Sequence, residues 1–145
     1  MIGLDTNVLI RYLTQDDPGQ FREATRLLEA LEANGESAHL SVTTMCEIVW
    51  VLSRGYKFAR GEIALVVKKF LETALFVVED RDHLREALAL YESGFGDFAD
   101  GLLGLRSLAA GCSRVATFDV ALHSRPEMFV KPAAVRRASR RPHQA

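Results

Sequence analysis

The stretch MIGLDTNVLIRYL (residues 1–13) places Asp5 between two apolar runs, residues 1–4 and residues 8–13. This order predicts a brief strand that passes directly into a helix, with Asp5 at the junction. Similar short apolar runs and amphipathic stretches recur along the chain. Further strands are expected at 38–42, 76–78 and 114–118, and helices at 20–33, 43–54, 60–75, 82–91 and 98–110. Thr43 or Thr44 is expected to cap the second of these helices, and Asp82 the fourth.

Strands that alternate with helices predict an α/β fold, because parallel strands need helical crossovers that cover the sheet. We therefore expect a three-layer α/β/α domain with a short central parallel sheet. Right-handed crossovers place the carboxyl ends of such strands along one edge of the sheet, where open α/β sheets bind their ligands. Side chains at strand ends are consequently the first candidates for a functional site.

The composition is that of one globular domain. The chain has 145 residues, of which 48% are hydrophobic and 26% are charged. Cys46 and Cys112 lie far apart and without paired histidines, which indicates neither a disulfide framework nor a zinc site and favours a reducing compartment. No apolar run approaches the roughly 20 residues of a membrane helix, and no signal peptide is recognisable. A cytoplasmic protein without a membrane segment is expected.

The last 15 residues differ from the rest in charge. Residues 131–145 contain five basic residues and no acid, so that the first 130 residues carry a net charge of −6 against −1 for the whole chain. The domain is therefore expected to span residues 1–130, followed by a flexible basic tail. This tail is either an RNA-binding extension or a solubilising end.

Carboxylates follow nearly every predicted strand. Asp5 and Asp119 end the first and the last strand, Glu47 falls near the start of the helix after the second strand, and Asp97 and Asp100 fall in the first turn of another helix. On one edge of a parallel sheet these acids would repel each other unless a cation bound them. Hard oxygen ligands favour Mg²⁺ or Mn²⁺, and such a site can promote the hydrolysis of a phosphodiester.

Each acid also has a purely structural interpretation. Glu47 could complete a capping box with Thr44, and Asp97 is a natural N-cap. Asp100 could interact only with the helix dipole, and Asp5 and Asp119 could cap the segments that follow them. Trp50, like its neighbour Val51, is expected in the core.

Four motifs, in order, resemble those of PIN-domain ribonucleases, especially the VapC-type toxins of bacterial toxin–antitoxin pairs. The similarity spans about residues 1–130. The motifs are DTNVLIRYL (residues 5–13), SVTTMCEIVWVL (residues 41–52), DFADGLL (residues 97–103) and TFD (residues 117–119).

This resemblance implies the roles of individual residues. The acids that bind the metal would be Asp5, Glu47 and Asp100, and Asp119 would complete the site. The family motif places its acid at Asp100, which leaves Asp97 as the N-cap or as a supporting group. Asn7 and Thr117 would support the site by hydrogen bonding to the carboxylates.

The implied function is that of an Mg²⁺- or Mn²⁺-dependent endoribonuclease that acts as the toxin of a pair, with RNA as substrate, a VapB-like antitoxin as partner and a homodimer as assembly. The main alternative is a PIN-domain nuclease of RNA processing that has no antitoxin, and a less favoured one is a non-catalytic binding module on the same fold. Two other classes that cluster acids at strand ends are not favoured. An aspartyl phosphatase would need a second Asp where Asn7 stands, and a receiver domain would need a lysine near the last strand, and neither is present.

Overall fold

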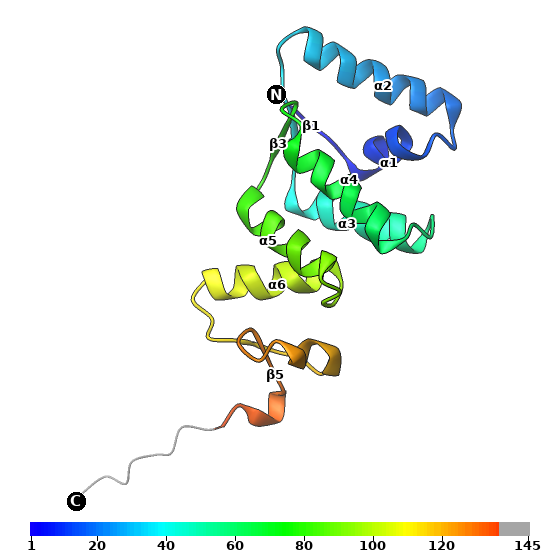
Figure 1. The fold of residues 1–145 in the computed structure, drawn as a ribbon. Helices are drawn as coiled ribbons and strands as arrows, with labels where there is room; N and C mark the ends of the chain where they lie inside the picture. Colours follow the sequence, from blue (N-terminus) through cyan, green and yellow to red (C-terminus); the bar gives the residue numbers. More distant parts are fainter. Residues whose placement is uncertain (137–145) are drawn as a thin grey trace, which may run out of the picture.

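The structure, a computed structural model, describes residues 1–136. Short strands are separated by pairs of helices from the amino terminus onward, in the order that the sequence predicts (Figure 1). The elements are β1 (Ile2–Gly3), α1 (Thr6–Thr14), α2 (Pro18–Ala33), β2 (Ala38–Leu40), α3 (Val42–Arg54), α4 (Arg60–Glu72), β3 (Phe76–Val78), α5 (Arg81–Glu92), α6 (Phe98–Ala109), β4 (Val115–Ala116), β5 (Phe129–Val130) and the 3₁₀ helices η1 (Val120–Ser124) and η2 (Pro132–Ala134).

All strand pairs of the described chain are parallel, which confirms the predicted α/β class with a short parallel sheet. The first sheet has the order β1-β2-β3, with Ala38 opposite both Ile2 and Phe76. The chain therefore leaves these three strands at one edge. β4 pairs with β5, which the sequence pattern did not predict, in a second sheet beyond α6 (Figure 1). Only two residues long, β4 is shorter than the strand expected at 114–118.

Two predicted helix starts are wrong. Ser41 caps α3 instead of Thr43 or Thr44, because its hydroxyl accepts a 3.1 Å hydrogen bond from the Thr44 amide. α5 follows Asp80 rather than Asp82, and Asp80 has a left-handed backbone with φ of 52°. In addition, α2 begins at Pro18, inside the expected break, because proline tolerates the first helical turn, where its missing N–H costs nothing.

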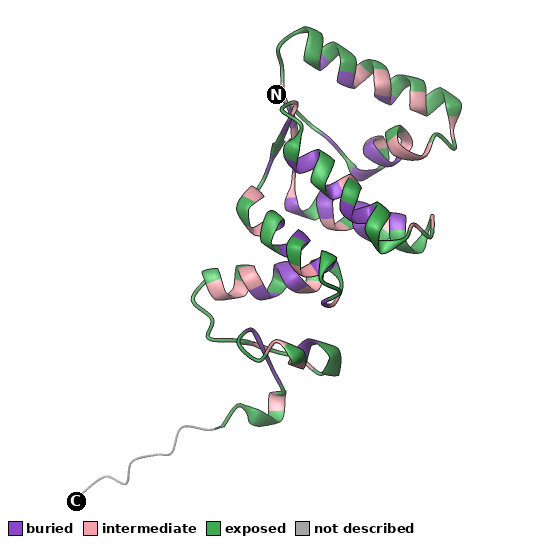
Figure 2. Cartoon of the chain, viewed as in Figure 1, coloured by how far each residue is buried: buried purple, intermediate pink, exposed green. Residues whose placement is uncertain are grey.

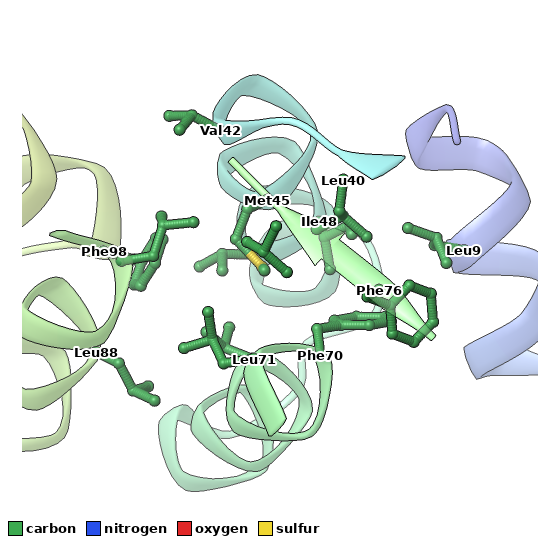
Figure 3. Packing of buried hydrophobic residues seen from close by; sticks show 14 of the residues in the cluster. Leu9, Leu40, Val42, Met45, Ile48, Phe70, Leu71, Phe76, Leu88 and Phe98 are labelled. Carbon is green, nitrogen blue, oxygen red and sulfur yellow. The ribbon is translucent and has the colours of Figure 1, made fainter. Parts of the chain in front are cut away.

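The main hydrophobic core lies among the first sheet and helices α1 to α6 (Figures 2 and 3). Met45, Ile48 and Leu52 of α3 are fully buried, at the three- and four-residue spacing of one helix face. Phe70 of α4 packs edge-to-face on Phe76 of β3, with ring centroids 5.1 Å apart. This core fixes α3 against the sheet and thereby fixes the acid that α3 carries.

A smaller hydrophobic cluster supports the second sheet. It consists of four buried residues, Phe95, Leu122, Met128 and Phe129. Gly104 of α6 lies against it, because an added Cβ would stand 3.0 Å from the Phe129 ring. The close approach of α6 to β5 therefore favours glycine, because any larger residue would force the Phe129 ring to shift.

The carboxyl-terminal tail is described only as far as residue 136. Its first part forms η2, and its arginines Arg137, Arg140 and Arg141 lie outside the described residues, as does most of the predicted flexible segment. Both cysteines are free thiols. Within residues 1–136, no helix is both long and apolar enough to cross a bilayer.

Candidate active site

Asp5 occupies the junction between β1 and α1 that the sequence predicts. Its exposed side chain caps α1, with Oδ1 accepting a 2.7 Å hydrogen bond from the Thr6 amide. The capping interpretation is therefore correct for one oxygen of this carboxylate. Its other oxygen makes no hydrogen bond within residues 1–136, so capping leaves it available to a ligand.

Thr6 connects Asp5 to Glu47. The Thr6 hydroxyl donates a 2.6 Å hydrogen bond to Oε2 of Glu47, on α3, and Thr6 is only 7% exposed. The Thr44 hydroxyl reinforces this junction by donating to the Leu4 carbonyl, at 3.4 Å. The proposed capping box between Thr44 and Glu47 is therefore wrong, because Glu47 bonds across to α1. Thr6 was not among the predicted site residues, although it stands between Asp5 and Asn7 in the first motif.

Asp97 and Asp100 lie at the start of α6. Asp97 is the N-cap residue, and its amide donates a 2.9 Å hydrogen bond to Oδ2 of Asp100. The preceding Gly96 has a φ of 51°, and a Cβ there would lie 3.2 Å from Asp100 and 2.9 Å from Leu122 of η1. The start of α6 thus packs directly against η1, the helix that Asp119 caps.

The side-chain oxygens of Asp119 and Thr117 form hydrogen bonds only within their own loop, in the described range 1–136. Oδ1 of Asp119 accepts a 3.1 Å hydrogen bond from the Ala121 amide, and the Asp119 amide donates to the Thr117 hydroxyl at 3.0 Å. Thr117 therefore bonds to the backbone of Asp119 and not to its carboxylate, unlike the predicted support. Asn7 is exposed and lines a pocket between α1 and α2 with Arg11.

The predicted acids thus lie in two groups. Asp5 and Glu47 are joined through Thr6, and the second group consists of Asp97, Asp100 and Asp119, around Gly96 and η1. Within residues 1–136, no three Asp, Glu, His or Cys side chains are close enough together to hold one metal ion. The donors still suit a hard cation, because Asp5, Glu47, Asp100 and Asp119 each leave one oxygen without a hydrogen bond in this part of the chain.

Arg60, at the start of α4, holds the loop that carries Asp97. Its guanidinium donates to the Tyr91 carbonyl at 2.6 Å, to the Phe95 carbonyl at 3.2 Å and to the Gly96 carbonyl at 2.5 Å. It also lies over the Tyr91 ring, 4.0 Å from the centroid. No sequence pattern predicts this contact, because the arginine and the loop lie more than 30 residues apart.

A pocket of about 270 Å³ separates α3 from the start of α6. The pocket is lined by Cys46, Val49, Trp50, Ser53, Arg54, Tyr91, Asp97, Phe98 and Ala99. Burial raises the pKa of both the Cys46 thiol and the Tyr91 hydroxyl, so both groups are uncharged at neutral pH. Trp50 is 62% exposed, which shows that the expected core position is wrong, whereas Val51 does pack against the core.

The comparison with known families identifies the class of the protein. The sequence model of the PIN domain matches residues 2–127, and this chain belongs to the PIN domain family. The match includes all four predicted acids. No solved structure gives a significant match to the fold.

One relative is also similar over most of its length. The chain is 32% identical over 115 residues to the VapC ribonuclease of Aquifex aeolicus (strain VF5). The aligned part covers 79% of this chain and 84% of that protein. The relative's name describes a ribonuclease, in agreement with the resemblance seen in the four motifs.

Proposed function

We propose that this protein is a metal-dependent endoribonuclease that acts as the toxin of a toxin–antitoxin pair. The observation that carries the proposal is the Thr6 connection, which unites Asp5 and Glu47 from separate elements in a chain that belongs to the PIN domain family. Similarity to a VapC ribonuclease supports both the RNA substrate and the toxin class.

The acids that would hold Mg²⁺ or Mn²⁺ are Asp5, Glu47 and Asp100, with Asp119 completing the set. Their carboxylate oxygens match the donors that these cations prefer. A bound divalent cation supplies charge neutralisation at the scissile phosphate and lowers the pKa of water. Because the acids lie in two groups, we expect the cation to draw the start of α6 and η1 toward the end of β1.

The surrounding side chains position these acids. Thr6 orients Asp5 through its amide and Glu47 through its hydroxyl, so that both carboxylates turn toward the same junction. Asp97 fixes Asp100 by donating its backbone N–H to Oδ2. Asn7 and Thr117 are proposed to support the site, Thr117 by holding the backbone of Asp119.

The partners follow from the same class of protein. We propose a VapB-like antitoxin that blocks the acidic site, a homodimer as the assembly, and action in the cytoplasm. Expression of the chain should then arrest growth, and coexpression of its antitoxin should restore it. Growth arrest that the Asp5→Asn variant causes equally well would contradict the toxin assignment.

Activity is tested on the purified chain freed of any partner. Structured RNA should be cut with Mg²⁺ or Mn²⁺, and EDTA, Asp5→Asn or Asp100→Asn should abolish cutting. Glu29→Gln, which neutralises an exposed acid on α2, is the matched control and should cut like wild type. Cleavage by Asp5→Asn at the wild-type rate would refute the acid assignment, and mapping of the cut ends would identify the RNA.

A further inference from the structure

Helix α3 exposes three chemically different side chains on one face. Glu47, Trp50 and Arg54 follow each other at spacings of three and four residues, which places them in a row along the helix. All three are exposed, and the Arg54 guanidinium makes no ion pair or hydrogen bond with any residue of the range 1–136. An aromatic ring therefore stands between a candidate catalytic carboxylate and an unpaired cation.

The pocket between α3 and α6 lies beside this row. Its floor is aromatic, since Tyr91 and Phe98 are buried and meet edge-to-face with centroids 6.2 Å apart and planes at 87°. Trp50 forms a wall, and Arg54 and Asp97 supply its two charged groups. Apolar walls with a few polar groups are the usual make-up of a small-ligand site, and this volume lies just below the usual range for such sites.

A single exposed hydrophobic side chain needs no functional explanation by itself, because soluble proteins expose many. Leu65 of α4 is as exposed as Trp50, at 61%. Trp50 differs because it lines a pocket and lies one helical turn from Glu47. The pocket also includes Asp97, at the start of the helix that carries the candidate acid Asp100.

We propose that this pocket binds an unpaired nucleobase of the RNA substrate, stacked on Trp50 beside the phosphodiester that is cut. Many RNA-binding proteins stack unpaired bases on aromatic side chains. Stacking itself accepts any base, because every base has a flat aromatic face. Arg54 contacts the adjoining phosphate, and Asp97 accepts hydrogen bonds from the N–H edge of the base. This assignment rests on the proposed ribonuclease function and adds a substrate-binding residue to it.

The size and charge of the pocket favour a base over another protein chain. A stable protein interface buries about 800 Å² on each partner and is depleted of charge at its centre. Here, a narrow pocket carries a cation and a carboxylate at its sides. The Arg54 guanidinium, which pairs with no residue of the range 1–136, complements the phosphate that adjoins a stacked base.

The fluorescence of Trp50 tests the proposal directly, because it is the chain's only tryptophan. The Asp5→Asn variant, in which the substitution prevents cleavage, is titrated in the presence of Mg²⁺ with a labelled single-stranded RNA oligonucleotide. Stacking should quench Trp50 emission in step with the anisotropy of the label. An oligonucleotide that is abasic at the stacked position should bind without this quenching.

Three outcomes overturn the assignment. Binding with unchanged Trp50 emission shows that the base lies elsewhere, and quenching by the abasic RNA shows a general effect of binding. Emission that changes with protein concentration alone assigns the pocket to a second copy of the chain. If neither the anisotropy nor cleavage by wild type shows any RNA interaction, the ribonuclease function itself fails, which distinguishes the two failures.

Variants provide the second arm. Trp50→Ala should raise KM for RNA about 5- to 150-fold, the range expected for one lost stacked base, with little change in kcat. Trp50→Phe should retain most of the affinity, and Leu65→Ala, equally exposed on α4, should change nothing. Arg54→Gln should reduce the slope of log Kd against log salt concentration by about one, as expected for the loss of one phosphate contact. Wild-type KM in Trp50→Ala would refute the pocket and leave the proposed ribonuclease intact.

Discussion

The two groups of acids are held in different ways. Glu47 is tied to the Asp5 junction by a hydrogen bond from Thr6, 41 residues away in the sequence. The second group has only local bonds, because Asp100 bonds three residues back and Asp119 two residues ahead. Long-range contacts exist only in the folded protein, whereas local caps form wherever the helix forms. The first group is therefore fixed by the tertiary structure, and the position of the second depends on what holds α6 and η1.

The two hydrophobic clusters show the same contrast. The main core joins two strands, β2 and β3, with the six helices α1 to α6, while the smaller cluster consists of four buried residues around β5. Regions with few buried contacts open at lower free energy than the global unfolding. We therefore expect β4, η1 and β5 to open without the main sheet.

Phe129→Ala is the strongest test of this difference. Phe129 is 1% exposed and fills the centre of the small cluster, so truncation should cost about 3–5 kcal/mol. Hydrogen exchange should accelerate at the amides of β4 and β5 and remain slow in β1, β2 and β3. Equal acceleration in both sheets would show that the chain unfolds as one unit.

Thr6→Val removes the bond between the junction and Glu47 with little change in volume. Loss of such a supporting hydrogen bond typically reduces metal affinity or activity by about 10–100-fold. Mn²⁺ affinity and the cleavage rate should fall together, and Thr6→Ser, which restores the hydroxyl, should recover most of both. Equal loss in the valine and serine variants would assign Thr6 a packing role alone.

Arg60→Met tests what holds the second group. The substitution removes three hydrogen bonds to the loop before Asp97, and we expect about 1–3 kcal/mol of local destabilisation because the arginine is partly solvated. Amide hydrogen exchange should accelerate at Gly96 and Asp97. The rate of RNA cleavage should fall most when the metal concentration is limiting. Arg22→Met, an exposed change on α2, is the control. Unchanged exchange in this loop would contradict the assignment.

Tyr56→Phe has the smallest expected effect. The Tyr56 hydroxyl donates to Asp16 at 2.6 Å and, with Thr14 and Arg11, lowers the pKa of that carboxyl from 3.8 to about 2. A lowered carboxyl pKa stabilises the folded state at pH values above the ordinary pKa of 3.8. This contribution to stability is lost as the pH falls toward the folded-state pKa of about 2. NMR titration should show a higher Asp16 pKa in the variant, and the stability difference from wild type should shrink on acidification. An unchanged Asp16 pKa would contradict the role of Tyr56.

The sequence predicts most elements, because apolar periodicity and helix caps are local signals. Asp5 at the strand exit and Asp97 at the start of α6 follow from these signals alone. The pairing of β4 with β5 does not, since Phe129–Val130 is too short to stand out and its partner is set by the packing of α6. The predicted core position of Trp50 is wrong because its hydrophobic character does not reveal which face of α3 it occupies. The structure places it on the exposed face.

Much the same holds for the candidate site. The four motifs name its acids, but the roles of Thr6 and Arg60 depend on contacts between segments distant in sequence. A hydroxyl next to an acid is a weak signal, and an arginine at a helix start is weaker still. The metal set itself remains a prediction, because the described structure leaves its members in two groups.

The direct passage from β1 into α1 restricts how this protein can evolve. Only Leu4 and Asp5 separate the strand from the helix, and the Leu4 carbonyl and the Thr6 hydroxyl both bond to α3. An inserted or deleted residue here would rotate Asp5 away from Glu47, whereas the exposed connection at 110–114 can change length freely. Sequence length should therefore vary among homologues at 110–114 and stay constant at 4–6.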